Sequence, residues 1–292
     1  MGASRTLRVG GVFVFALVPL GISGSPSQEP AESLDIGILI GDSIVHGFGR
    51  SPVLYNERGN VFLEDHYRFR AHLDGPVESL AGFLGMPLWL NRGVTGNPSA
   101  SVLARWNRDV LEKLDRGHQK STHRVRGLLI SVGLTDIGAA VGSNLMRDAE
   151  AALRENLLTF VRQAKKERIR IVFLELPDPD RAPMGKTFRT LDGRTIDSFC
   201  ESRGYDQASC SEFNGAVKRT RRFMEGPLRK AGAEIVDYAS ILSTEYFLDA
   251  THPTPDGYVE LGKILRDQYP GPSRANARGA DSRGRSFALR PN

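Results

Sequence analysis

The feature that most constrains the fold of this chain is a regular alternation of short apolar segments with longer stretches of helical period. Five segments are short, rich in β-branched residues and bounded by polar or glycine positions: Asp35–Ile40, Pro87–Asn91, Gly127–Val132, Ile169–Leu176 and Glu234–Asp237. Several of them are apolar at successive positions rather than at every second one, which is typical of strands covered on both faces. We therefore expect a mainly parallel, five-stranded sheet that is buried between helices.

The stretches between these segments carry apolar residues at intervals of three and four, the period of an amphipathic helix. They cover residues 99–114, 145–167, 213–232 and 255–268. Before the first of them, Asn97 is a candidate N-cap and Pro98 suits the first helical position. Strand and helix alternate along the whole chain, which predicts a three-layer α/β/α sandwich.

Two connections are too long for this regular pattern. Residues 50–76 are rich in charged and aromatic side chains, and residues 177–212 are rich in Pro, Asp and Gly. Both follow expected strands, so we expect them at the carboxyl edge of the sheet, where open α/β sheets bind ligands. Long connections in compact domains are often functional.

The N-terminus has the three-part pattern of a secretory signal peptide. Arg5 and Arg8 precede an apolar run that is followed by small residues, so we assign residues 1–24 as the signal. The run is short for a membrane span and contains Pro19, although a retained signal-anchor remains the alternative. Residues 25–33 are typical of a linker. The pattern predicts a secreted protein or one of the periplasm or cell envelope, held at a membrane only if the segment is kept.

Charge is concentrated at the C-terminus rather than spread over the expected domain of residues 34–270. The chain has a net charge of +5, and residues 271–292 contain five arginines against one aspartate. We expect this tail to be disordered. The remaining chain is close to neutral, which gives no electrostatic reason to expect nucleic-acid binding.

The chain has two cysteines, Cys200 and Cys210. An even number suits a disulfide in an exported protein, and the short loop would give about 2–3 kcal/mol of stabilisation. Their spacing does not match a metal site, and no His pair lies nearby in the sequence. We expect neither a metal nor an organic cofactor.

Candidate catalytic groups lie where the expected strands end. Ser43 follows the first strand directly, as either a nucleophile or the cap of a helix. An activated serine needs a base and a group that orients the base. His252, with Asp249 three residues before it, can supply both, although the same residues suit a capped turn before the last helix. Gly93 follows the second strand and permits close backbone approach.

Four short motifs occur in order along the chain: "GDS" (41–43), "NRGVTG" (91–96), "GLTD" (133–136) and "DATHP" (249–253). Over roughly residues 34–269 the sequence resembles the SGNH (GDSL) hydrolase family. The resemblance implies a flavodoxin-like sandwich in which Ser43 is the nucleophile, His252 the base and Asp249 the group that orients it. It places the oxyanion hole on the N–H groups of Ser43 and Gly93.

One motif departs from the family pattern. The family has Asn in the third motif, G-x-N-D, where this chain has Thr135. A hydroxyl donates one hydrogen bond but reaches less far than an amide. Three outcomes stay open: the Thr135 hydroxyl donates in place of the amide, another group replaces it, or the enzyme is slow or specialised. Asp136, the next residue, is expected to cap a helix.

These observations predict an exported serine esterase that hydrolyses carboxylic esters through an acyl-serine intermediate. Its expected substrates are small-molecule or glycan esters, such as O-acetyl groups on glycans or short acyl lipids. Two alternatives stay open at this point: an O-acyltransferase that uses a sugar acceptor, and a non-catalytic glycan-binding domain of the same fold.

Overall fold

The computed structural model describes residues 34–47, 80–112 and 123–269. All of them belong to the compact unit Ser33–Asn292. The expected signal peptide (1–24), the expected linker (25–33), the C-terminal residues 271–292 and the connection 50–76 lie outside the described residues. None of the helices in the described ranges has the length and apolar character needed to cross a membrane.

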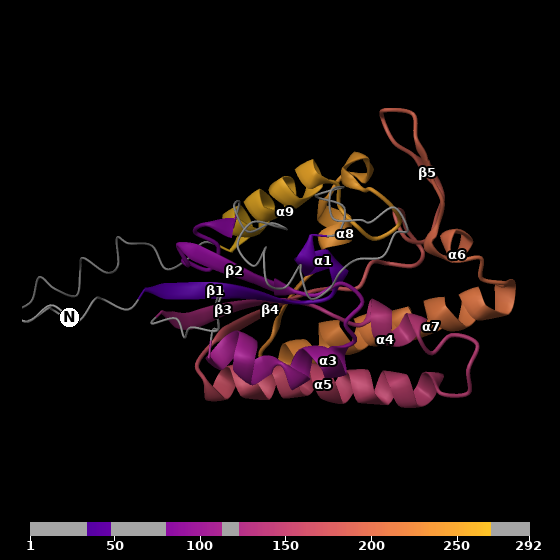
Figure 1. Ribbon diagram of the computed structural model, residues 1–292. Coiled ribbons are helices and arrows are strands. Elements are labelled where there is room, and N and C mark those ends of the chain that lie inside the picture. The colour runs from indigo at the N-terminus through magenta and orange to yellow at the C-terminus, as the bar shows by residue number, and fades with distance from the viewer. Residues whose placement is uncertain (1–33, 48–79, 113–122, 270–292) are drawn as a thin grey trace, which may run out of the picture. The chain divides into compact units, whose positions relative to one another are not determined.

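The described residues form a five-stranded parallel sheet, as predicted (Figure 1). Its strands are β1 (Asp35–Gly41), β2 (Leu88–Gly93), β3 (Arg124–Ser131), β4 (Arg170–Leu174) and β7 (Glu234–Val236). They lie in the order β2-β1-β3-β4-β7, which is the flavodoxin-like order. The order reverses at β1, so the ligand site of such a sheet is expected beside the carboxyl end of β1.

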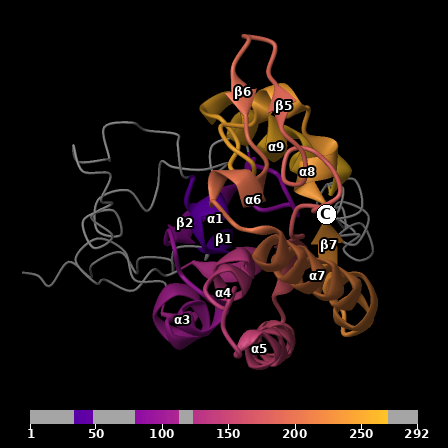
Figure 2. The same cartoon turned by 90° about the vertical axis from the view of Figure 1, so that its right-hand side faces the viewer.

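Helices cover both faces of the sheet and complete the three layers (Figure 2). Alternate residues of β1 divide between the faces: Ile36, Ile38 and Ile40 join one core cluster, and Leu39 joins the other. The first cluster includes residues of α3 (Ser99–Ala104), α5 (Met146–Lys166) and α7 (Gln207–Phe223). The second includes residues of α1 (Ser43–His46), α8 (Tyr238–Ile241) and α9 (Pro255–Gln268). This two-sided burial explains the continuous apolar runs in the sequence.

Two expected helices differ from the observed ones. The stretch 99–114 is not one helix: α3 ends at Ala104, and a π-helical turn, η3 (Asn107–Leu111), follows. Between them Arg105 turns inward and donates to the carbonyl of Gly41 at 3.0 Å. Pro98, rather than Asn97, is the N-cap residue.

The helix expected over 213–232 begins earlier, because the side chain of Asp206 caps α7 by accepting from the Ser209 N–H at 2.7 Å. It ends in a second π-helical turn, η4 (Met224–Leu228), which contains Pro227. Proline lacks the N–H that a regular helix needs there, and this explains the change in helix type.

The connection 177–212 has structure of its own beyond the carboxyl edge of the sheet (Figure 1). It holds a small hairpin, β5 (Phe188–Arg189) with β6 (Thr195–Ile196), and the short helix α6 (Phe199–Ser202). The remaining elements are α4 (Leu134–Gly138) and the 3-10 turn η5 (Thr244–Tyr246).

Candidate active site

Ser43 lies at the sharp turn from β1 into α1. Gly41 has φ +152°, and a Cβ there would lie 2.1 Å from the carbonyl oxygen of Ser131, so only glycine fits. Asp42 is the N-cap of α1 and accepts from the Ile44 N–H at 3.1 Å. Ser43 is therefore the first helical residue. The cap of α1 is Asp42, while Ser43 is left with its hydroxyl at the carboxyl edge of the sheet.

His252 lies against Ser43 although the two are 209 residues apart. The distance from His252 Nε2 to Ser43 Oγ is 2.7 Å, which is hydrogen-bonding distance. On the other side of the ring, Nδ1 lies 2.8 Å from Asp249 Oδ2. The structure thus brings Ser43, His252 and Asp249 together in one chain of hydrogen bonds.

Asp249 is held in place by its own turn. Its Oδ1 accepts from the backbone N–H groups of Thr251 and His252, each at 2.8 Å. Partial burial alone would raise the pKa of Asp249, but the hydrogen bond and charge of His252, together with these N–H groups, lower it to about 2. The carboxylate is therefore ionised at neutral pH and able to hold the Nδ1–H tautomer of His252.

The expected oxyanion role of Gly93 is wrong, because its N–H is already used. It donates to Asn91 Oδ1 at 2.8 Å, while Asn91 Nδ2 donates to the Val45 carbonyl at 2.8 Å. Gly93 is buried, and a Cβ there would lie 2.4 Å from the backbone N of His46. Its absent side chain allows β2 to pack closely against α1.

Gly96, the second glycine of "NRGVTG", faces the pocket that Gly93 was expected to face. It is exposed, has φ +75° and lines the same pocket as Ser43 and His252. No described residue accepts a hydrogen bond from its N–H. Both glycines of the motif suit a close backbone approach, so the sequence does not show which of them faces the pocket.

Thr135 also lines this pocket, in the first turn of α4. Its carbonyl accepts from the Ala139 N–H at 3.1 Å, and no described residue is hydrogen-bonded to its hydroxyl. Thr135 is therefore placed near Ser43 with a donor that is not engaged elsewhere in the described structure.

Asp136 caps a helix, although not its own. Its two carboxylate oxygens each accept from the Ser99 N–H at 3.0 Å, and Oδ1 accepts from the Ser99 hydroxyl at 2.6 Å. Ser99 is the first residue of α3. Burial raises the pKa of Asp136 above its ordinary value, and the bonds from Ser99 act in the opposite direction.

Asp42 is the most deeply buried carboxyl group of the site, with 2 % of its surface exposed. Burial raises its pKa to about 6, although the bond from the Ile44 N–H and the nearby Ser131 and His252 lower it in part. Its role as the cap of α1 was not predicted from the sequence.

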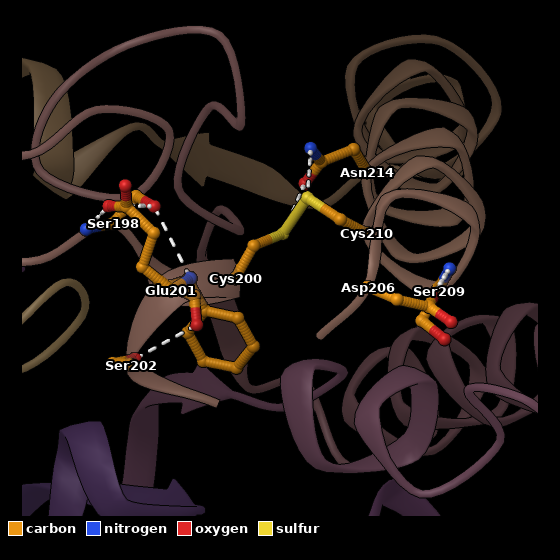
Figure 3. The surroundings of a disulfide bond; sticks show 9 residues. Ser198, Cys200, Glu201, Ser202, Asp206, Ser209, Cys210 and Asn214 are labelled. Atoms are coloured by element: carbon orange, nitrogen blue, oxygen red, sulfur yellow. Dashed lines mark hydrogen bonds between the residues drawn. A yellow bond between two sulfur atoms is a disulfide. The ribbon is translucent and has the colours of Figure 1, made fainter. Parts of the chain in front are cut away.

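The pocket beside Ser43 has a volume of about 440 Å³. One wall of the pocket contains Phe199, Arg203 and Tyr205, which come from the connection 177–212. None of the three was predicted from the sequence to have a role. They belong to α6 and the residues after it, and a bridge between Cys200 and Cys210 joins this segment to α7 (Figure 3). Among the described residues, no three His, Cys, Asp or Glu side chains are grouped as a metal site would require.

This arrangement supports acyl transfer. His252 is placed to take the hydroxyl proton of Ser43, and its imidazolium form would be stabilised by Asp249. The N–H of Ser43, at the start of α1, and that of Gly96 are candidate donors for a developing oxyanion.

The sequence matches the GDSL-like Lipase/Acylhydrolase family over residues 39–259. No curated protein matches it. Similar solved structures include a lipase/acylhydrolase from Enterococcus faecalis, with 18% identity, 80% of this chain and 95% of that chain covered, and a TM-score of 0.43. A lipase from a goat rumen metagenome has 14% identity, 82% and 99% coverage, and a TM-score of 0.49. An acetylxylan esterase mutant from Geobacillus stearothermophilus has 17% identity, 80% and 94% coverage, and a TM-score of 0.46.

Proposed function

The chain belongs to the GDSL-like lipase/acylhydrolase family, and on that premise we propose that it is an exported serine esterase that hydrolyses carboxylic esters. One observation carries the proposal. The Ser43 hydroxyl lies 2.7 Å from His252 Nε2, and His252 Nδ1 lies 2.8 Å from Asp249. Nucleophile, base and orienting acid are thus arranged for covalent catalysis before any substrate binds.

In the first half of the proposed reaction, Ser43 Oγ attacks the ester carbonyl carbon while His252 Nε2 takes its proton. The tetrahedral intermediate collapses, the ester C–O bond breaks, and the proton passes from His252 to the departing alcohol. In the second half, His252 takes a proton from water as the water oxygen attacks the acyl-serine. Collapse then releases the carboxylic acid and returns the proton to Ser43.

The negative charge on the carbonyl oxygen of each intermediate is assigned to three donors. Ser43 offers its N–H as the first residue of α1, and Gly96 offers an exposed N–H from the turn after β2. The Thr135 hydroxyl is the third donor, in place of an amide. Donors of this kind contribute about 3–4 kcal/mol each to transition-state stabilisation when they are well placed.

The proposed substrates are esters with a short acyl group, such as O-acetyl groups on glycans or short acyl lipids. Export is inferred from the pattern of residues 1–24, and the Cys200–Cys210 bridge is consistent with an oxidising compartment. No nucleic-acid partner is proposed. A membrane is a partner only if the N-terminal segment is kept as an anchor.

The test is an assay of the purified protein on para-nitrophenyl acetate and butyrate beside three variants. Ser43→Ala is expected to lower kcat by at least about 10³-fold, and Asp249→Asn by about 10²- to 10⁴-fold, because both remove part of one catalytic unit. Ser101→Ala is the matched control, since Ser101 is exposed on α3 and outside the pocket. Equal turnover by the wild type and Ser43→Ala would refute the role of Ser43.

A fluorophosphonate probe and a set of sugar acceptors separate the remaining alternatives. The wild type and Ser101→Ala should be labelled, and Ser43→Ala should not. A wild-type protein that the probe does not label would point to a non-catalytic binding domain. More acylated sugar than free acid in the presence of acceptors would instead identify an acyltransferase.

A further inference from the structure

One wall of the pocket beside Ser43 is formed by the connection 177–212 rather than by the sheet and its regular turns. Phe199, Arg203 and Tyr205 line the pocket together with Ser43 and His252. We call these three residues the α6 wall. Its composition, two aromatic rings and a guanidinium, is that of a recognition surface rather than of a catalytic group.

The α6 wall is held firmly to the rest of the domain. The disulfide joins Cys200 on α6 to Cys210 on α7 (Figure 3). Phe199 stacks on Phe213 of α7 with ring centroids 4.6 Å apart, and Tyr205 lies 5.9 Å from the same ring. The wall is therefore positioned before a substrate arrives, which reduces the entropy lost on binding.

A capping box at the start of α6 engages Glu201, the carboxylate nearest to Arg203 in the sequence. Ser198 and Glu201 cap each other, and Glu201 Oε2 accepts from the Ser198 N–H at 2.9 Å and from its hydroxyl at 2.7 Å. Glu201 also accepts from the Thr187 hydroxyl. This carboxylate is satisfied by Ser198 and Thr187, and among the described residues it forms no ion pair with Arg203.

The Arg203 guanidinium is exposed, and its carbon lies 5.2 Å from the centre of the Phe199 ring. This cation–π contact orients the group without neutralising it. No carboxylate of the described residues forms an ion pair with Arg203. The pocket's own carboxyl group, on Asp42, is buried and engaged at the start of α1.

Resting on the proposed function, we propose that Arg203 is a specificity-determining residue that favours esters carrying a carboxylate near the scissile bond. A guanidinium pairs with a carboxylate through two parallel hydrogen bonds, which gives geometric selectivity as well as attraction. Because the proposed acyl group is short, the carboxylate belongs to the alcohol part of the ester. The predicted substrate class is therefore acyl esters of acidic alcohols, such as acidic sugars.

The hydrolysis test compares two esters that differ in charge, para-acetoxybenzoate and para-acetoxybenzamide. Arg203→Gln is expected to lower the ratio of their kcat/KM values, anionic over neutral, by about fivefold, the upper range for an exposed ion pair. Arg203→Lys should keep part of the preference, and high salt should reduce it in the wild type. Lys230→Gln removes the same charge from an exposed site just before β7 begins, at the opposite edge of the sheet, and should leave the ratio unchanged.

A binding test separates failure of this proposal from failure of the proposed function. On the Ser43→Ala background, the unreactive amides para-acetamidobenzoate and para-acetamidobenzamide are titrated by NMR. Adding Arg203→Gln should raise the Kd of the carboxylate about fivefold relative to that of the neutral amide. This result would support the role of Arg203 even if Ser43 proved not to be the nucleophile. An unchanged ratio in either test would overturn the proposal.

Discussion

The carboxylate of Asp136, on α4, accepts hydrogen bonds from both the N–H and the hydroxyl of Ser99, the first residue of α3. Thr135 precedes Asp136, and Gly96 lies three residues before Ser99. The pair therefore ties together the turns that carry two of the three proposed oxyanion donors, Gly96 and Thr135. Asn156 on α5 donates to the same Ser99 hydroxyl at 2.8 Å and extends the network into the helical layer.

Asp136→Ala is expected to reduce the free energy of unfolding by about 1–2 kcal/mol, because it leaves the start of α3 without its acceptor. It should also lower kcat, since Gly96 and Thr135 lose their common anchor. Asp136→Asn keeps one acceptor oxygen and should cost less in both respects. Urea unfolding and esterase assays measure the two effects. Wild-type stability in Asp136→Ala would contradict the capping role.

The two glycines of "NRGVTG" should respond differently to alanine. At Gly93 the new Cβ would lie 2.4 Å from the His46 backbone N, and the resulting shift of α1 should cost about 3 kcal/mol or more, together with activity. At Gly96 a Cβ meets nothing within 4 Å, so only the positive φ is costly, by about 1 kcal/mol. Gly96→Ala keeps its N–H and should stay active. Thermal unfolding and kinetics check both, and equal effects would contradict the separate roles.

Thr135→Val replaces the hydroxyl with a methyl group of nearly the same size. If the hydroxyl donates to the oxyanion, kcat should fall by about 10²- to 10³-fold while KM changes little. Thr135→Ser keeps the donor and should retain most of the activity. Fluorophosphonate labelling of Ser43 shows that the valine variant is still folded around its nucleophile. An unchanged kcat in Thr135→Val would remove Thr135 from the oxyanion hole.

Asp42 should make the stability of the protein depend on pH. Its pKa is about 6 in the folded chain and near 3.8 when unfolded, so between these values the folded state binds more protons. The contribution of Asp42 to the free energy of unfolding is therefore lost as the pH rises from about 4 to about 6. The loss is at most about 3 kcal/mol.

The measurement compares Asp42→Asn with the wild type by urea unfolding across this pH range. Asn keeps an oxygen that can accept from the Ile44 N–H, but it does not titrate. The variant should gain stability relative to the wild type as pH rises. If the free energies of unfolding of the two proteins changed with pH in the same way, ionising the buried Asp42 carboxyl would have no free-energy cost. That result would contradict the prediction.

Much of the fold could be predicted because it follows from local patterns. The apolar runs at 35–40 and 127–132 have strand character and are covered on both faces, and the period of 145–167 gives α5 within one residue at each end. The helix breaks could not be predicted in this way. The interruption after Ala104 accompanies the inward turn of Arg105 toward Gly41, a contact between residues 64 positions apart.

The site also combines features that follow from local sequence patterns with features that depend on contacts between distant residues. Ser43, Asp249 and His252 were identified because short motifs carry them, and the structure brings these residues together. Gly93 and Gly96 could not be told apart, because the difference is which N–H is already bonded by Asn91. Arg203 has no motif, and its place beside Ser43 depends on how a long connection folds back over the sheet edge.

The disulfide also has a consequence for how this domain can diversify. The loop closed by Cys200 and Cys210 contains Arg203 and Tyr205, whereas Ser43, Asp249 and His252 all lie outside it. If Arg203 sets substrate preference as proposed, that preference depends on a short segment closed by its own disulfide, and the proposed catalytic residues lie outside it. Substitutions at Arg203 and Tyr205 would then change which esters bind while leaving Ser43, Asp249 and His252 in place.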